Sequence, residues 1–197
     1  MLNSYINNKY INNINLEFNR NKNFKYLILK NFFKKELIIK FKKKLLKEKF
    51  YFKESDLFSF YQTNDLINNK NKNIYNFYNF FNSVKFKTYT FSLTGIRAFG
   101  KIDCAGFIYK NTNYLLPHDD ELEKRKIAYI LYLNDLNEDE GGQLQFFNNN
   151  KLIKSISPKF NTLILFRAEA GKTIHQVKEV VGKNTKRLSI AGWFNDK

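Results

Sequence analysis

The spacing of apolar residues predicts helices in the first half of the chain. Residues 32–50 have the sequence FFKKELIIKFKKKLLKEKF, in which apolar positions recur every three or four residues, as in an amphipathic helix. The apolar face of this helix comprises Ile38, Phe41, Leu45 and Leu46. Lysines fill most of the other positions, so we expect the helix to pack on the outside of a sheet and to show its lysines to water.

A second helix is predicted over residues 73–86. Its aromatic face comprises Tyr75, Tyr78 and Phe81, and aromatic residues at helical spacing usually belong to a core. On either side the patterns are shorter. Residues 24–29 and 88–95 each predict a strand, and residues 51–72 predict a loop with short turns.

From Phe107 onward, short apolar runs alternate with turn residues. The predicted strands are residues 107–109, 126–133, 143–147, 161–166, 174–181 and 186–193. The residues that separate them are Asn111, Pro117, 134–142, 148–151 and 182–184. Many short strands at this spacing are typical of a β-sandwich or barrel.

The domain organisation follows from length and composition. A chain of 197 residues fits one domain with a sizeable core, and no repeat or proline-rich linker divides it. The first 24 residues are dominated by asparagine, lysine and isoleucine, which predicts a flexible N-terminal segment. We expect residues 25–197 to form one domain, with helical support over about 25–100 and a β core over about 86–197.

Cysteine content and hydropathy indicate the cellular compartment in which the protein is found. Cys104 is the single cysteine, so the chain has no disulfide framework, and no catalytic partner near it in sequence supports a nucleophile. The first twenty residues lack an unbroken apolar core of a signal peptide, and no stretch is long enough to span a membrane. These features predict a soluble intracellular protein with no membrane contact.

The net charge of +16 is concentrated in the first half. Residues 1–100 contain 19 Lys and Arg against 6 Asp and Glu, whereas residues 101–197 contain 15 against 12. One interpretation is a gene rich in A and T, because Lys, Asn, Ile, Phe and Tyr are enriched together. The other is an affinity for RNA, ribosomes or acidic partners. The two interpretations are compatible.

Candidate chemistry begins at the triplet His118-Asp119-Asp120. In an extended chain, side chains two residues apart point the same way, so His118 and Asp120 share a face while Asp119 points away. The chain has one other histidine, His175. Two histidines and one carboxylate can occupy one face of an octahedral Fe(II) and leave positions open for a chelating co-substrate and oxygen. These three residues are therefore the predicted iron ligands.

The surrounding motifs support a specific family. They are YLLPHDDELEKRKIAYILYL (residues 114–133), Gly141-Gly142, PKFNTLILF (158–166), HQVKEV (175–180) and RLSIAGWF (187–194). In this order they resemble the Fe(II)/2-oxoglutarate-dependent prolyl hydroxylases, closest to the catalytic domain of the ribosomal-protein prolyl 3-hydroxylases. The resemblance covers roughly 90 residues and is thinner before them.

The resemblance implies a fold and an activity. The fold would be a double-stranded β-helix, a cupin-like jelly roll whose two sheets enclose the metal, with N-terminal helices buttressing the larger sheet. The activity would be hydroxylation of a prolyl residue in a protein, with release of succinate and CO2. It would use Fe(II), 2-oxoglutarate and O2, with ascorbate as a candidate reductant. The implied partner is a proline-containing protein or peptide, first of all a small-subunit ribosomal protein. Independently of the resemblance, the charge of the basic N-terminal half makes RNA a candidate partner.

The same resemblance assigns the co-substrate residues. Arg187 would hold the C5 carboxylate of 2-oxoglutarate, because a guanidinium grips a carboxylate through two parallel hydrogen bonds and stays charged when buried. Tyr109 and Tyr132 match tyrosines that the family places against the co-substrate, although both could be ordinary core residues. Ser189 lies on the same strand face as Arg187 and would help to hold the carboxylate.

Two geometric points stay open at this level. The strand with Ala128, Ile130 and Tyr132 on one face is apolar on both faces, so periodicity does not say which face looks inward. If the chain turns back at residues 182–184, Arg187 lies on a strand beside that of His175.

Several other residues have simpler explanations. Asp119 and Glu121 are expected to orient their loop or to remain solvated. Gly141-Gly142 predicts a tight turn into a strand, because no GK[ST] follows that would make a phosphate loop. Trp193 is expected in the core beneath the site. Pro117 departs from the residue expected before HDD.

Two alternative functions remain. A same-fold oxygenase acting on nucleic acid, such as an alkylated-base demethylase, would account for the basic charge. A non-catalytic jelly-roll binding module would keep the fold without turnover, although the retained ligand set and Arg187 argue against it. The eukaryotic members of the resembled family also carry a second, non-catalytic jelly roll, and only the catalytic one is matched here.

Overall fold

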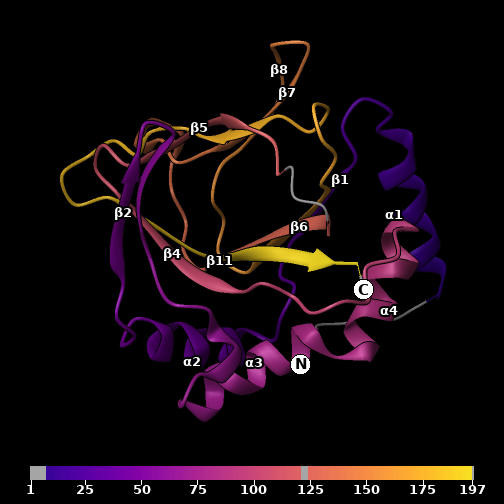
Figure 1. Ribbon diagram of the computed structural model, residues 1–197, viewed down its shortest axis with the longest axis horizontal. Helices are drawn as coiled ribbons and strands as arrows, with labels where there is room; N and C mark the ends of the chain where they lie inside the picture. The colour runs from indigo at the N-terminus through magenta and orange to yellow at the C-terminus, as the bar shows by residue number, and fades with distance from the viewer. Residues whose placement is uncertain (1–7, 121–123, 197) are drawn as a thin grey trace.

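The computed structural model describes residues 8–120 and 124–196 (Figure 1). The first half contains α1 (Asn8–Arg20), β1 (Tyr26–Leu29), α2 (Lys35–Leu45), β2 (Tyr51–Ser55), β3 (Phe58–Gln62), the 3-10 helix η1 (Leu66–Asn68), α3 (Lys72–Asn82) and α4 (Val84–Thr94). The second half contains β4 (Ala105–Lys110), β5 (Tyr114–His118), β6 (Arg125–Tyr132), the 3-10 helix η2 (Glu138–Glu140), β7 (Leu144–Asn148), β8 (Lys151–Ile156), β9 (Thr162–Arg167), β10 (His175–Val177) and β11 (Lys186–Asn195). The chain is mainly β with N-terminal helices, as predicted.

The strands form one antiparallel sheet that folds back on itself. Its order is β1-β9-β6-β11-β4-β3-β5-β10-β7-β8, and β2 pairs with β3. The larger layer consists of β1, β9, β6, β11 and β4, and the smaller layer consists of β5, β10, β7 and β8. Strand β3 pairs with both β4 and β5 and so joins the two layers. Side chains from both layers meet inside, for example Phe146 of β7 and Phe166 of β9, whose ring centroids are 5.3 Å apart.

The four helices cover the outer face of the larger layer, as expected for a buttress (Figure 1). On β6, Tyr129 and Leu131 point toward this helical layer, and Phe81 of α3 lies 5.2 Å from the Tyr129 ring. Ala128, Ile130 and Tyr132 point to the interior between the two layers. The packing thus identifies the inward face of β6, which periodicity left open.

The strand predicted over residues 88–95 is wrong, because this segment belongs to α4. The hydroxyl of Ser83 accepts a hydrogen bond from the Phe86 amide and starts α4, which ends the preceding helix earlier than predicted. Gly95 closes α4 with a left-handed φ of 71°. Inside α4, the hydroxyl of Thr90 donates to the Phe86 carbonyl, so a β-branched residue that favours strands is accommodated in a helix.

The loop predicted over residues 51–72 is also wrong in part. It contains the hairpin of β2 and β3, in which Ser55 pairs with Phe58 across a short turn. The structure adds β5 and β8 as well. Pro117 lies within β5, where the register against β10 shifts between Leu115 and His118, so the irregular pairing accommodates a residue without an amide hydrogen.

The N-terminal segment differs from the flexible tail predicted for it. Residues 8–20 form α1, whose Ile14 and Phe18 are buried in the core. Asn15 also ties α1 to α4, because its side-chain amide donates to the Leu93 carbonyl at 3.2 Å. Residues 1–7 lie outside the described part of the chain. Within that part, no helix is long and apolar enough to cross a membrane.

The aromatic core between the helices and the sheet should dominate stability. Phe81 is fully buried, whereas Tyr75 on the same helix is 44% exposed. We expect Phe81→Ala to lower the free energy of unfolding by about 3–5 kcal/mol, because it leaves a cavity. Tyr75→Ala should change it by less than about 1 kcal/mol. Urea denaturation of both variants measures the difference, and equal losses would contradict this description of the core.

Candidate active site

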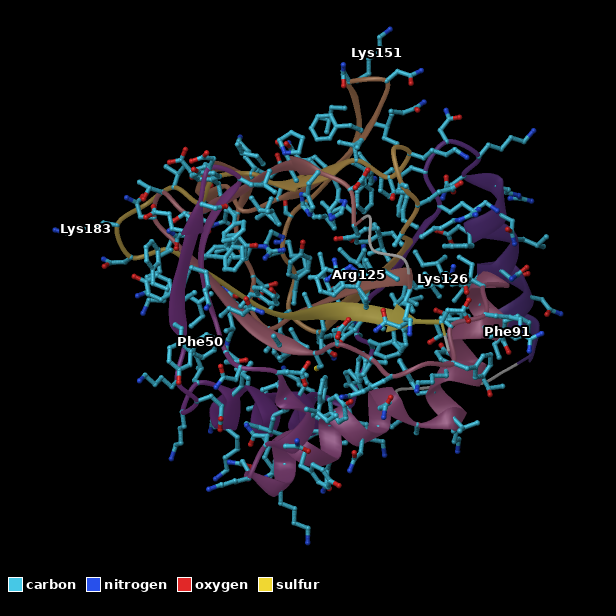
Figure 2. All side chains as sticks on the ribbon, in the orientation of Figure 1. Phe50, Phe91, Arg125, Lys126, Lys151 and Lys183 are labelled. Carbon is cyan, nitrogen blue, oxygen red and sulfur yellow. The ribbon has the colours of Figure 1, made fainter. Side chains whose placement is uncertain are left out.

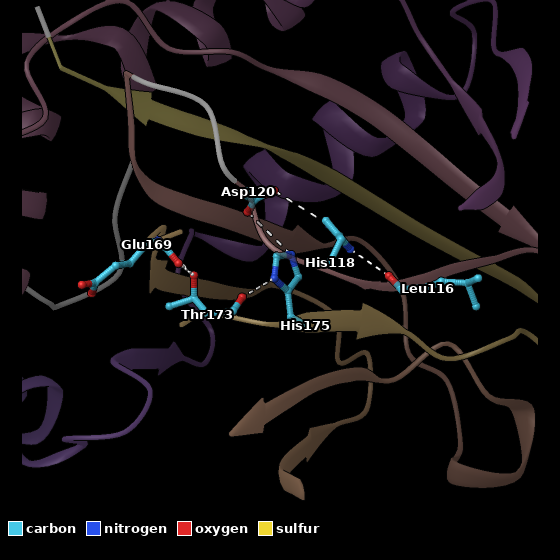
Figure 3. A network of polar contacts seen from close by, with 6 residues as sticks. All are labelled: Leu116, His118, Asp120, Glu169, Thr173 and His175. Carbon is cyan, nitrogen blue, oxygen red and sulfur yellow. Dashed lines mark hydrogen bonds and ion pairs between the residues drawn. The ribbon is translucent and has the colours of Figure 1, made fainter. Parts of the chain in front are cut away.

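The three predicted iron ligands converge at the open end of the smaller layer. β5 and β10 are paired so that His118 lies opposite His175, and Asp120 follows two residues after His118. Nε2 of His118 is 3.8 Å from Oδ1 of Asp120, and Nε2 of His175 is 3.6 Å from Oδ2 (Figure 3). One donor atom from each residue can be chosen so that all lie within 4.8 Å of one another. This spacing suits a single metal ion.

Both imidazole rings are oriented by backbone carbonyls. Nδ1 of His118 lies 2.8 Å from the Leu116 carbonyl, and Nδ1 of His175 lies 2.9 Å from the Thr173 carbonyl. A carbonyl oxygen only accepts hydrogen bonds, so in each neutral ring the proton sits on Nδ1 and the lone pair on Nε2. The free lone pairs are therefore on the two Nε2 atoms near Asp120, so both are available to bind one metal ion.

The loop before His175 is itself tied down. The hydroxyl of Thr173 donates to the Glu169 carbonyl at 3.0 Å and accepts from the Glu169 amide at 2.9 Å. The Gly171 amide donates to Oδ2 of Asp119 at 2.7 Å. Asp119 thus orients a loop, one of its two expected roles, and links the segment of His118 to that of His175. Glu121 lies outside the described residues.

Arg187 is a buried cation in the same interior. It is 2% exposed, and its guanidinium donates to the hydroxyls of Ser189 at 3.3 Å and Tyr132 at 3.4 Å. The guanidinium carbon lies 4.9 Å from the Tyr109 ring centroid and 5.0 Å from that of Tyr132. Burial raises the pKa of Tyr109, so its hydroxyl stays protonated.

The charge of Arg187 has no protein counter-ion in the part of the chain described. No carboxylate there lies within ion-pairing distance of it, and its Nε has no hydrogen-bond partner. A buried charge without a partner is costly, whereas a bound carboxylate would supply both the charge and the missing acceptor. The site therefore fits an anionic ligand.

One cavity joins the cluster of His118, Asp120 and His175 to the guanidinium of Arg187. It has a volume of about 250 Å³ and is lined by His118, Asp120, His175, Arg187, Ser189 and Tyr109, among others. Tyr132 reaches the same place through its contact with Arg187. The fold thus brings together all seven residues singled out from the sequence.

Arg187 does not lie on a strand beside that of His175, which was expected if the chain turned back at residues 182–184. β11 does not pair with β10; it pairs with β4 and β6, and Arg187 lies opposite Tyr109 on β4. The chain after β10 crosses from the smaller layer to the larger one instead of turning back beside it. Arg187 therefore faces His118, Asp120 and His175 across the interior, and it does not lie on a strand next to that of His175.

Phe58, Phe60 and Arg125 are among the cavity-lining residues that were not predicted as part of the site. Phe58 and Phe60 of β3 form part of the cavity wall. Their spacing of two residues in the sequence was the signal that could have predicted a strand with both rings on one face. Arg125 also lines the cavity, with its guanidinium 3.3 Å from the centroid of the Trp193 ring (Figure 2). Trp193, expected in the core beneath the site, is half-buried and lines the cavity itself.

Comparison with known proteins agrees with this geometry. Residues 104–195 match the family model of the 2OG-Fe(II) oxygenase superfamily. This part of the chain belongs to that superfamily. The superfamily implies Fe(II), 2-oxoglutarate and O2, and the residues fit the first two: two neutral imidazoles and a carboxylate suit Fe(II), and the unpaired guanidinium suits a diacid.

Two similar proteins illustrate the sequence relationship. The chain is 37% identical over 159 residues to the prolyl 3-hydroxylase of Mus musculus, covering 77% of this chain and 29% of that protein. It is 33% identical over 168 residues to the prolyl 3,4-dihydroxylase of Ostreococcus tauri, covering 75% and 33%. The chain thus spans about a third of the length of these relatives.

Solved structures show the fold. A prolyl-4-hydroxylase of Pseudomonas putida superposes with a TM-score of 0.73 at 15% identity, covering 93% of this chain and 99% of that one. The prolyl hydroxylase of Trichoplax adhaerens, solved with a hypoxia inducible factor peptide, gives 0.74 at 20% identity, covering 96% and 90%. The predicted jelly-roll fold is confirmed.

Burial of His175 gives the metal-free protein a pH dependence. Burial, partly offset by Asp120, lowers the pKa of His175 from 6.5 to about 4. Between these values the unfolded chain binds a proton at this residue that the folded chain does not, so protonation favours unfolding. We therefore expect the neutral, buried His175 to contribute fully to the free energy of unfolding above pH 6.5. This contribution should decline as the pH falls from 6.5 toward 4.

The variant His175→Asn isolates this effect, because asparagine can still donate to the Thr173 carbonyl but does not titrate. Urea denaturation with a chelator present, from pH 7.5 down to about 4, should show a smaller decline in the variant. Parallel declines in the two proteins would contradict the assignment. Carboxylates that titrate in the same range are common to both and cancel.

Proposed function

We propose that this protein is an Fe(II)- and 2-oxoglutarate-dependent dioxygenase that hydroxylates a prolyl residue of a protein. The proposal depends chiefly on one observation: the unpaired guanidinium of Arg187 shares a cavity with two histidines and one aspartate. The names of the two relatives above, both prolyl hydroxylases, support the choice of acceptor. In the overall reaction one oxygen atom of O2 enters succinate and the other enters the proline, with loss of CO2.

Each residue has a definite task in this proposal. Iron and 2-oxoglutarate, when bound, supply the oxygen-activating chemistry. Nε2 of His118, Nε2 of His175 and a carboxylate oxygen of Asp120 would hold the metal. Arg187, assisted by the hydroxyls of Tyr132 and Ser189, would fix the far carboxylate and so orient the co-substrate.

The remaining walls control solvent. Tyr109 lies against the guanidinium, and the phenyl rings of Phe58 and Phe60 close one side of the cavity. Apolar walls strengthen the charge-assisted hydrogen bonds of Arg187, because they keep water away from them. They also protect reactive species from side reactions with water.

We extend the proposal to a substrate: a proline in a small-subunit ribosomal protein, with ascorbate as the reductant that maintains Fe(II). The motifs from His118 to Trp193 that resemble the ribosomal-protein prolyl 3-hydroxylases motivate this choice. The matched relatives are about three times as long as the aligned region, so their additional segments could contribute to substrate choice.

The test is incubation with Fe(II), 2-oxoglutarate, ascorbate and proline-containing peptides from small-subunit ribosomal proteins. We expect succinate release and one added oxygen atom on a proline by mass spectrometry. His118→Ala should lower both at least about 100-fold, since a ligand is lost, whereas Leu152→Ala, at a 52% exposed leucine on β8, should not.

Other outcomes of this test would change the assignment. Succinate release that requires an alkylated oligonucleotide and not a peptide would favour the nucleic-acid oxygenase. No succinate above the His118→Ala level with any acceptor would favour a non-catalytic binding module. Turnover with unrelated proline-rich peptides but none from ribosomal proteins would retain the hydroxylase and remove the ribosomal substrate.

The basic helix α2 is the surface that we propose for RNA contact. Lys40 and Lys43 are exposed on α2, on the side away from the core, and the exposed Lys47 lies in the turn just after the helix. In the part of the chain described, no carboxylate forms an ion pair with them. Lys40 and Lys43, three positions apart in the helix, repel one another, and the phosphates of RNA would relieve that repulsion.

Replacing all three lysines by glutamate should weaken binding of single-stranded RNA and reduce the slope of log K against log salt by about 2. The matched control replaces three exposed lysines away from α2. Lys151 and Lys183 are labelled in Figure 2, and Lys154 lies on β8 with Lys151. Fluorescence anisotropy over a salt series measures both. Equal weakening by the two triple variants would show a general charge effect and no binding surface on α2.

A further inference from the structure

Gly142 is packed against the side chain of Arg187. Its φ is +70°, and a Cβ at this position would lie 3.2 Å from Cδ of Arg187, 3.0 Å from Cδ1 of Leu136 and 3.2 Å from Cγ2 of Val180. Distances this short require the neighbours to move by a few tenths of an ångström. Of these neighbours, only Arg187 belongs to the candidate site.

The backbone of Gly142 has no freedom to withdraw. Its amide donates to the Lys178 carbonyl at 3.1 Å and to the Glu179 carbonyl at 3.3 Å. The preceding Gly141 forms a bridge with Val180, and a Cβ on Gly141 would collide with the Glu179 carbonyl. The glycine pair is thus held against the segment after β10, so an added side chain at Gly142 would have to displace its neighbours.

If Cδ of Arg187 is displaced, the whole guanidinium must move with it, because its surroundings hold the group as one unit. It is held between the rings of Tyr109 and Tyr132 and donates to Ser189 and Tyr132. A displacement of Cδ therefore changes the angle and position of the donors that remain for a ligand. Charge-assisted hydrogen bonds weaken when their donors are misaligned.

We propose that Gly142 is a positioning residue for Arg187: its missing side chain leaves the space in which the arginine stem lies, and this sets where the guanidinium meets the second carboxylate of the co-substrate. The inference rests on the proposed use of 2-oxoglutarate at this site. It gives Gly142 a role beyond the tight turn predicted for the Gly141-Gly142 pair. This role concerns Arg187 alone and not the predicted iron ligands.

The test compares two ligands on Mn(II)-loaded protein by calorimetry. 2-Oxoglutarate has the second carboxylate, whereas 2-oxopentanoate has the same chain length and a methyl group in its place. Both present the same chelating 2-oxoacid end, so the ratio of their affinities reports the contact with Arg187. We expect the unmodified protein to prefer 2-oxoglutarate by roughly 10- to 100-fold.

Gly142→Ala should reduce this preference by about tenfold while leaving affinity for 2-oxopentanoate and for Mn(II) unchanged. The matched control is Gly95→Ala. Gly95 has a φ of +71°, and a Cβ added there would meet nothing within 4 Å, so this variant carries the same backbone strain without the contact. Gly95→Ala should keep the full preference.

A double variant guards against a folding defect. Leu136→Val shortens the side chain nearest to the added Cβ, and in combination with Gly142→Ala it should restore part of the preference for 2-oxoglutarate. Full preference in Gly142→Ala, or equal losses for both ligands, would overturn the inference. Absence of any preference in the unmodified protein would instead remove the proposed co-substrate.

Discussion

The buried charge of Arg187 is the constraint around which the interior is organised. Two tyrosine rings and two hydroxyls accommodate the guanidinium, yet no carboxylate in the described residues neutralises it and its Nε has no acceptor. Burying a charge in this way costs stability unless a ligand completes the site. The jelly roll tolerates it because the rest of the interior is rich in buried aromatic and aliphatic side chains, whose burial offsets the cost.

The cluster of His118, Asp120 and His175, the predicted iron ligands, depends on a different kind of interaction, in which backbone groups orient side chains. The carbonyls of Leu116 and Thr173 determine which nitrogen of each imidazole is protonated, and the pairing of β5 with β10 determines the distance between the rings. The register of two short strands therefore controls both the tautomers and the spacing of the ligands. A slip of one residue would turn His175 to the other face of its strand and remove the site.

The sequence allowed the site to be predicted better than the N-terminal half. His118, Asp120, His175 and Arg187 lie in short motifs whose residue types have few other uses together, so local pattern was enough. The helix α4 was predicted as a strand because its threonines and aromatics favour extended structure, and only the Ser83 cap and contacts with the core decide otherwise. The pairing partner of β11 could not be predicted, because it depends on how the whole sheet closes.

The residues that line the cavity come from two parts of the chain. The predicted iron ligands and Arg187, the predicted carboxylate anchor, fall within residues 104–195, the part that matches the oxygenase superfamily. Phe58 and Phe60, which form a wall of the same cavity, come from a hairpin before that region. These two rings therefore come from outside the matched region, whereas the predicted iron ligands and Arg187 come from inside it. Substitutions at Phe58 or Phe60 can therefore change the shape of the cavity while His118, Asp120, His175 and Arg187 stay unchanged.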